Sequence, residues 1–237
     1  MNEHAFSAPY MASEAPAEQR AQFIRRTYLH LAAAILFFTA LEVSLFKSGM
    51  ADSILKMMVG GKYTPLIVLA LFIGASFLAN WWARSDSSPA LQYAGLTLYV
   101  IADAIIFVPI LWYAQKFSGP TVLPMAAFFT LLLFAGLTLS AFITRKNFSF
   151  LGPIVTIASL IALGVAVASM IFGFNLGILF SAVMVLIAGA SILHTTSNII
   201  HEYRPDQHVA ASLALFAAVA MLFYYILRIL IELTGRR

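Results

Sequence analysis

Cysteine is absent from the 237-residue sequence, and charged side chains make up only 10% of it. The first absence excludes disulfides and thiolate chemistry, although it leaves the redox compartment open. The second excludes a soluble globular domain, in which about 25% of residues are charged, because so few charges cannot cover a folded surface. With 62% hydrophobic residues and a mean hydropathy of +0.91, the sequence predicts an integral membrane protein surrounded by the lipid bilayer.

Motifs for catalysis are also missing. The sequence has no phosphate-binding loop, no nucleophile with its base and no zinc-protease motif, so we expect neither an enzyme nor a cofactor. The net charge of +4 lies mostly in loops, where basic residues help to set membrane topology, and it does not indicate a nucleic-acid partner. Residues 1–19 are polar, contain two prolines and lack a basic stretch before an apolar core. They predict a short disordered tail rather than a signal peptide, followed by a single transmembrane helical domain over residues 20–237.

Long apolar segments fill the rest of the chain. Each can cross a hydrocarbon core of ~30 Å as a helix, and none alternates as a barrel strand would. The sequence therefore predicts an all-α fold, a polytopic membrane protein built as a seven-helix bundle, with spans at residues 23–46, 65–83, 91–114, 122–143, 150–173, 176–200 and 209–233.

The distribution of lysine and arginine bears on orientation. With a cytoplasmic N-terminus and seven spans, the inner side carries seven Lys and Arg residues and the outer side six. If the last segment is re-entrant, Arg236 and Arg237 move inside and the counts become nine and four. Because basic residues favour the cytoplasmic side, we expect a cytoplasmic N-terminus. The last segment either spans the membrane or is re-entrant.

A polar stripe follows one face of the segment at 176–200 and continues to its end. Ser191, His194, Thr195, Asn198 and His201 recur at three- and four-residue steps, so on a helix they face the same way. In a bilayer such a face needs a protein interior or a water-filled cavity. His194 can sense pH, since imidazole titrates near neutral pH, or it can be a neutral histidine bonded to a backbone carbonyl or to Asn198. We expect no metal site, because His194 and His201 lie ~10 Å apart along the axis.

Two acidic residues lie within predicted spans. Asp103 is midway along the third span, where a carboxylate costs at least ~2.5 kcal/mol and should face the bundle interior. It is either a cation or proton site or a protonated structural acid. Glu42 either guards an outer vestibule or lies at the interface beside Lys47. Arg228 and Glu232, four residues apart in the last segment, can pair on one helix face.

One stretch carries a family resemblance. Residues 136–152, GLTLSAFITRKNFSFLG, closely resemble the signature of the Bax inhibitor-1 family, small multispanning proteins found from bacteria to animals. The stretch ending at 197–201 resembles that family's sixth span. Residues 211–216 and 222–230 resemble its last segment. The resemblance covers roughly 21–233 in order.

The resemblance implies a seven-helix fold, a bacterial inner-membrane location and, for several members, a pH-sensitive calcium leak. In such members two buried aspartates, one on each of the last two helices, form the sensor. This sequence has Thr195 at the first position and Ala218 near the second, and neither can titrate as a carboxylate. Other bacterial members of the family modulate a membrane-bound protease.

Two functional hypotheses result. The first is a membrane cation leak, for calcium or protons, with a polar route from the outer face through the middle of the membrane to the inner face. Its pathway residues would be Glu42, Asp103, His194, Thr195 and Asn198, with His194 and Asp103 sensing pH. The alternative is a non-transporting regulator that binds another membrane protein, such as a membrane-bound protease.

Overall fold

The computed structural model describes residues 11–85 and 88–235. Over these residues the chain is helical without strands, and seven helices are long and apolar enough to cross a membrane, which confirms the predicted polytopic helical bundle. The elements are α1 (Ala17–Lys47), α2 (Met50–Val59), α3 (Thr64–Ala83), α4 (Pro89–Phe117), α5 (Val122–Thr144), α6 (Leu151–Phe172), α7 (Gly177–His201) and α8 (His208–Thr234).

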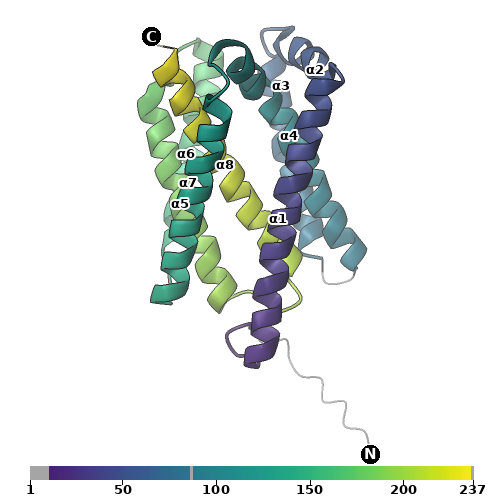
Figure 1. Ribbon diagram of the computed structural model, residues 1–237, viewed down its shortest axis with the longest axis vertical. Coiled ribbons are helices and arrows are strands. Elements are labelled where there is room, and N and C mark those ends of the chain that lie inside the picture. The colour runs from purple at the N-terminus through teal and green to yellow at the C-terminus, as the bar shows by residue number, and fades with distance from the viewer. Residues whose placement is uncertain (1–10, 86–87, 236–237) are drawn as a thin grey trace, which may run out of the picture.

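Helix α8 is the centre of the bundle. It contacts α1, α3, α4, α5 and α7, and Figure 1 shows it passing between α1 on one side and α5 to α7 on the other. Most of its residues up to Leu222 are buried, and many are alanines, which let neighbouring helices approach closely. It is one continuous helix of 27 residues, so the last segment does not turn back as a re-entrant loop.

Helices α3 and α4 form a closely packed pair because of one glycine. A Cβ atom added at Gly95 of α4 would lie 2.5 Å from the carbonyl oxygen of Ala79 and 2.7 Å from the amide nitrogen of Ala83, both on α3. A glycine facing two alanines brings the helix backbones into contact, as at other small-residue interfaces in membranes. This pair supplies one wall of the main cavity described below.

Helix α2 was not predicted. Residues 47–64 lie between the first two predicted spans, yet Met50–Val59 form a ten-residue helix that is too short to span a membrane. Its position is fixed by a hydrogen bond of 2.7 Å that the Trp112 indole nitrogen of α4 donates to Asp52, and by the buried side chains of Ala51 and Met58.

The N-terminal region differs in part from the predicted tail. Residues 1–10 lie outside the described residues, but residues 11–16 form a turn and α1 already begins at Ala17. The amide of Ala12 donates to the carbonyl of Tyr203 at 2.8 Å, and the hydroxyl of Ser13 donates to the carbonyl of His201 at 3.1 Å. The structure therefore places residues 11–19 in an ordered turn and helix, docked at the α7–α8 connection.

Candidate functional site

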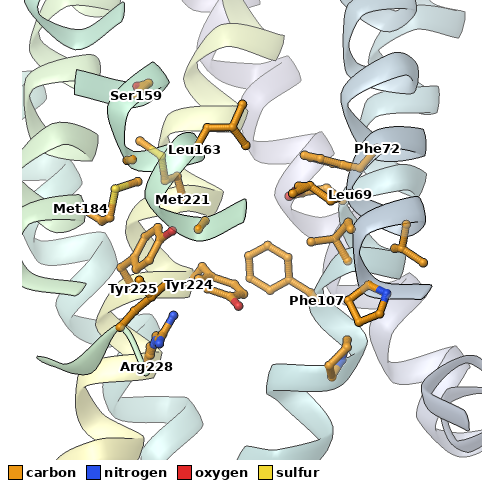
Figure 2. A pocket seen from close by; sticks show the side chains of 18 of the residues that line it. Leu69, Phe72, Phe107, Ser159, Leu163, Met184, Met221, Tyr224, Tyr225 and Arg228 are labelled. Atoms are coloured by element: carbon orange, nitrogen blue, oxygen red, sulfur yellow. The ribbon is translucent and has the colours of Figure 1, made fainter. Parts of the chain in front are cut away.

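A cavity with a volume of about 830 Å³ is surrounded by α2, α3, α4, α6, α7 and α8. Its lining is mostly apolar, and Asp103 is the one acidic side chain among the described residues that line it. Figure 2 shows Arg228 beside Tyr224 and Tyr225 at one end and Ser159 at the other. We call this space the Asp103 cavity.

Helix α4 presents Asp103 to this cavity. Tyr99 and Phe107, one turn before and one turn after, line the same space, so the three side chains share a helix face. Asp103 is 5% exposed, and its Oδ2 atom has no hydrogen-bond partner. Ala218 of α8, near which the resemblance places the second family aspartate, lines the cavity too. In this chain the carboxylate of the cavity is therefore that of Asp103 on α4, and α8 has an alanine at the corresponding wall position.

Glu42 lies in a second cavity, of about 410 Å³, between α1, α4, α5 and α8. It is 7% exposed and neither carboxylate oxygen has a hydrogen-bond partner. This burial does not match the interfacial position beside Lys47 that the sequence also allowed. Thr39, Gln115 and Thr130 supply the other polar side chains of this lining. We call it the Glu42 cavity.

An aromatic wall, made of Phe38, Tyr99, Phe107, Phe216 and Phe223, lies between the two cavities. Phe107 and Tyr99 line the Asp103 cavity, whereas the other three line the Glu42 cavity. The rings contact one another across the wall. The ring centroid of Phe107 lies 5.1 Å from that of Phe38 and 5.9 Å from that of Phe223, and the centroids of Tyr99 and Phe216 are 6.1 Å apart. The structure therefore keeps the two acids in separate spaces.

The polar stripe of α7 is packed against the loop that precedes α6. The imidazole Nδ1 of His194 donates to the carbonyl of Phe148 at 3.4 Å, while its Nε2 lies 3.2 Å from the side-chain amide of Asn198. The amide of Phe148 donates to the Ser197 hydroxyl at 2.8 Å. Gly152 faces the same ring, since a Cβ there would lie 2.8 Å from Cε1 of His194. We call Phe148, Gly152, His194, Ser197 and Asn198 the His194 cluster.

This geometry suits a neutral imidazole. A carbonyl can only accept, so Nδ1 carries the proton, and Nε2 can then accept from the Asn198 amide. A protonated His194 would also fit if the Asn198 amide turned its oxygen toward Nε2, because that oxygen has no partner now. The cluster can therefore hold either protonation state with one amide rotation.

The predicted pathway residues are not joined into one channel. Ser191 of the stripe lines the Asp103 cavity, but His194, Thr195 and Asn198 are not among the described residues that line either cavity. Thr195, at the first family aspartate position, is buried in the bundle. In this state a continuous route is interrupted by the aromatic wall and by the His194 cluster.

Several of these features escaped the sequence interpretation. Arg228 and Glu232 do not pair: Arg228 lines the Asp103 cavity, and Glu232 Oε2 is buried without a partner. Gly152 was noted only as the end of the family signature, and its contact with His194 was not predicted. The aromatic wall had a usable signal, because Tyr99 and Phe107 flank Asp103 at four-residue steps on one helix face.

Comparison with known proteins gives the same family as the resemblance. Residues 20–235 match the family described as inhibitor of apoptosis-promoting Bax1. The chain is 29% identical to Bax inhibitor 1 of Schizosaccharomyces pombe, over 89% of this chain and 76% of the yeast protein. It is 28% identical to an uncharacterised protein of Pseudomonas aeruginosa, over 93% of this chain and 94% of that protein. The chain therefore belongs to the Bax inhibitor-1 family.

Proposed function

We propose that the protein is a cation leak of the membrane, with Asp103 as the central binding group and the proton as the ion that the site suits best. The observation that carries this proposal is a buried carboxylate with an unpartnered oxygen, on the wall of a cavity of about 830 Å³. A carboxylic acid in the middle of a membrane span is energetically unfavourable, and such acids more often belong to ion or proton pathways than to purely structural positions.

The lining of the cavity favours protons over calcium. Calcium takes about six to eight oxygen ligands, whereas Asp103 is the only carboxylate among the described lining residues. Arg228 lines the same cavity, and a fixed positive charge opposes a divalent cation twice as strongly as a monovalent one. A proton needs one acceptor at a time, which Asp103 supplies.

The closed state requires an opening step, which we assign to the His194 cluster. Protonation of His194 would turn Nε2 into a second donor and force the Asn198 amide to rotate. The new positive charge would lie beside the Phe148 carbonyl of the loop before α6, and Ser191, one turn away on α7, lines the Asp103 cavity. We therefore place the opening step where α7 meets this loop. With a cytoplasmic N-terminus in a bacterial inner membrane, the cluster faces the cytoplasm, and the leak would respond to cytoplasmic pH.

Flux measurements on the purified full-length protein in liposomes test this proposal. Proton flux and calcium flux are followed with separate dyes, over a pH range from acidic to mildly basic. We expect proton flux well above empty liposomes and a weaker calcium flux. His194→Gln, which cannot take up a proton, should remove the pH dependence, while the control Asn147→Gln, in the same connection between α5 and α6, should keep it.

Absence of both fluxes from folded protein would reject the leak. It would favour the alternative of a regulator that binds another membrane protein, such as a membrane-bound protease. For that alternative, the docked residues 11–16 show where the N-terminal region is held. A partner that copurifies with the full chain, and is lost when residues 1–19 are removed, would support it.

A further inference from the structure

We infer that the Asp103 cavity also binds a single-chain anionic amphiphile, a long-chain fatty acid in its carboxylate form, whose headgroup is held by Arg228. This inference concerns a second ligand and does not depend on cation flux. It rests on the charge at one end of the cavity, on the apolar lining of the rest and on the weak packing of the helix that closes the space toward lipid.

The end of the Asp103 cavity at which Arg228 lies is near the membrane surface. Arg228 comes six residues before the end of α8 at Thr234, a distance of about 9 Å along the helix. Residues of the α6–α7 connection, Phe174 to Leu176, line the same cavity. A headgroup held at Arg228 would thus lie at the depth where lipid headgroups meet the acyl region.

Arg228 is free to take an anionic ligand. It is partly buried, and Glu232, one turn further along α8, does not pair with it. Figure 2 places the phenol rings of Tyr224 and Tyr225 next to the guanidinium. A guanidinium binds a carboxylate through two parallel hydrogen bonds. Arg228, flanked by the two phenol rings, therefore supplies the headgroup site for a carboxylate.

The remaining lining suits an acyl chain. Leu69 and Phe72 of α3 face Leu163 of α6 and Met221 of α8 across the space in Figure 2. A volume of about 830 Å³ lies within the ~300–1,000 Å³ range of small-molecule sites. Apolar contact along such a lining favours a long chain, since each buried CH₂ group adds to binding.

The loose packing of α6 leaves the cavity accessible from the bilayer. This helix packs on α7, touches α3 at few positions and leaves the cavity partly open. A chain can therefore enter between α3 and α6 from the lipid, while the headgroup stays near the surface. An apolar opening to lipid together with a fixed cation at headgroup depth is complementary to a fatty acid rather than to a soluble ligand.

Photolabelling of the full-length protein in phosphatidylcholine nanodiscs tests the site. The probe is a palmitic acid analogue with a diazirine near the end of its chain, and labelled peptides are identified by mass spectrometry. We expect labels on the cavity face of α3 and α6, displaced by palmitic acid but not by hexadecanol. Equal displacement by hexadecanol, or labels spread evenly over the lipid-facing helices, would overturn the inference by indicating bulk lipid contact.

Variants separate the headgroup site from the chain site. Arg228→Gln should lower specific labelling roughly tenfold or more, because a charge-assisted hydrogen bond is lost, and Arg228→Lys should keep part of it. Lys116→Gln, an exposed cation at the end of α4, is the matched control and should label like the unchanged protein. If Arg228→Gln does not fold, Leu163→Trp is the second test, because it narrows the part of the cavity that would hold the acyl chain and keeps Arg228. Full labelling of Leu163→Trp would refute the site.

Discussion

Replacing Gly152 by alanine should disrupt the His194 cluster without altering any polar group. The added Cβ would lie 2.8 Å from Cε1 and 3.1 Å from Nε2 of His194. Ordinary contacts between such atoms are about 3.4 Å or longer, so the ring must retreat by about 0.6 Å. Its two hydrogen bonds, at 3.4 Å and 3.2 Å, already lie near the upper limit for such bonds. At least one of them should be lost.

The size of the effect can be worked out against a matched control. Loss of one hydrogen bond costs about 1 kcal/mol net. Gly164 lies on the same helix with nothing within 4 Å of an added Cβ, so Gly164→Ala should gain about 0.5–1 kcal/mol from helix propensity alone. Gly152, at the second position of α6, gains little from propensity. We therefore expect Gly152→Ala to be less stable than Gly164→Ala by about 2 kcal/mol.

Equilibrium unfolding in mixed micelles measures this difference, and proton flux in liposomes gives an independent readout. Gly152→Ala should unfold at lower denaturant and leak faster than Gly164→Ala, because α7 and the loop before α6 are no longer held together. Equal stability of the two variants would refute the reasoning, since it would mean that His194 moves aside without losing a bond that matters.

Two further substitutions test the packing that shapes the cavities. Gly95→Ala forces a Cβ to 2.5 Å from the carbonyl oxygen of Ala79. The two helix backbones must move apart to admit it, so the change should cost about 3 kcal/mol and lower the yield of monodisperse protein. Gly74→Ala, with open space at its Cβ, should do neither. Phe107→Ala removes the central ring of the aromatic wall, joins the two cavities and should cost about 3 kcal/mol while raising proton flux; Phe128→Ala, on an exposed ring, should leave the flux unchanged.

The spans were predictable because their evidence is local. Seven apolar segments of about 20 residues can only satisfy their backbone groups in lipid as helices, and the helices α1 and α3 to α8 lie where those segments were drawn. Helix α2 escaped because ten residues are too few to register as a span. Residues 11–16 escaped because their order comes from bonds to Tyr203 and His201, almost 200 residues away, and composition carries no information on such contacts.

The candidate site was predictable only in its chemistry. Depth along the third span identified Asp103 as a buried acid, and helical spacing identified the stripe that holds His194 and Asn198. Which space each residue reaches depends on how helices pack side by side. The four-residue spacing allowed Arg228 to pair with Glu232. In the structure Arg228 lines the Asp103 cavity, whereas Glu232 is not among the described residues that line it.

The most direct test of the central claim moves the carboxylate from one helix to another. Asp103→Asn should reduce proton flux to the level of empty liposomes, while Asp206→Asn, the same change at an exposed loop position, should leave it unchanged. Ala218→Asp, introduced into the Asp103→Asn protein, places an acid from α8 on the wall of the same cavity and should restore flux. Flux that persists in folded Asp103→Asn protein would contradict the account, because the cavity would then conduct without its only carboxylate among the described residues.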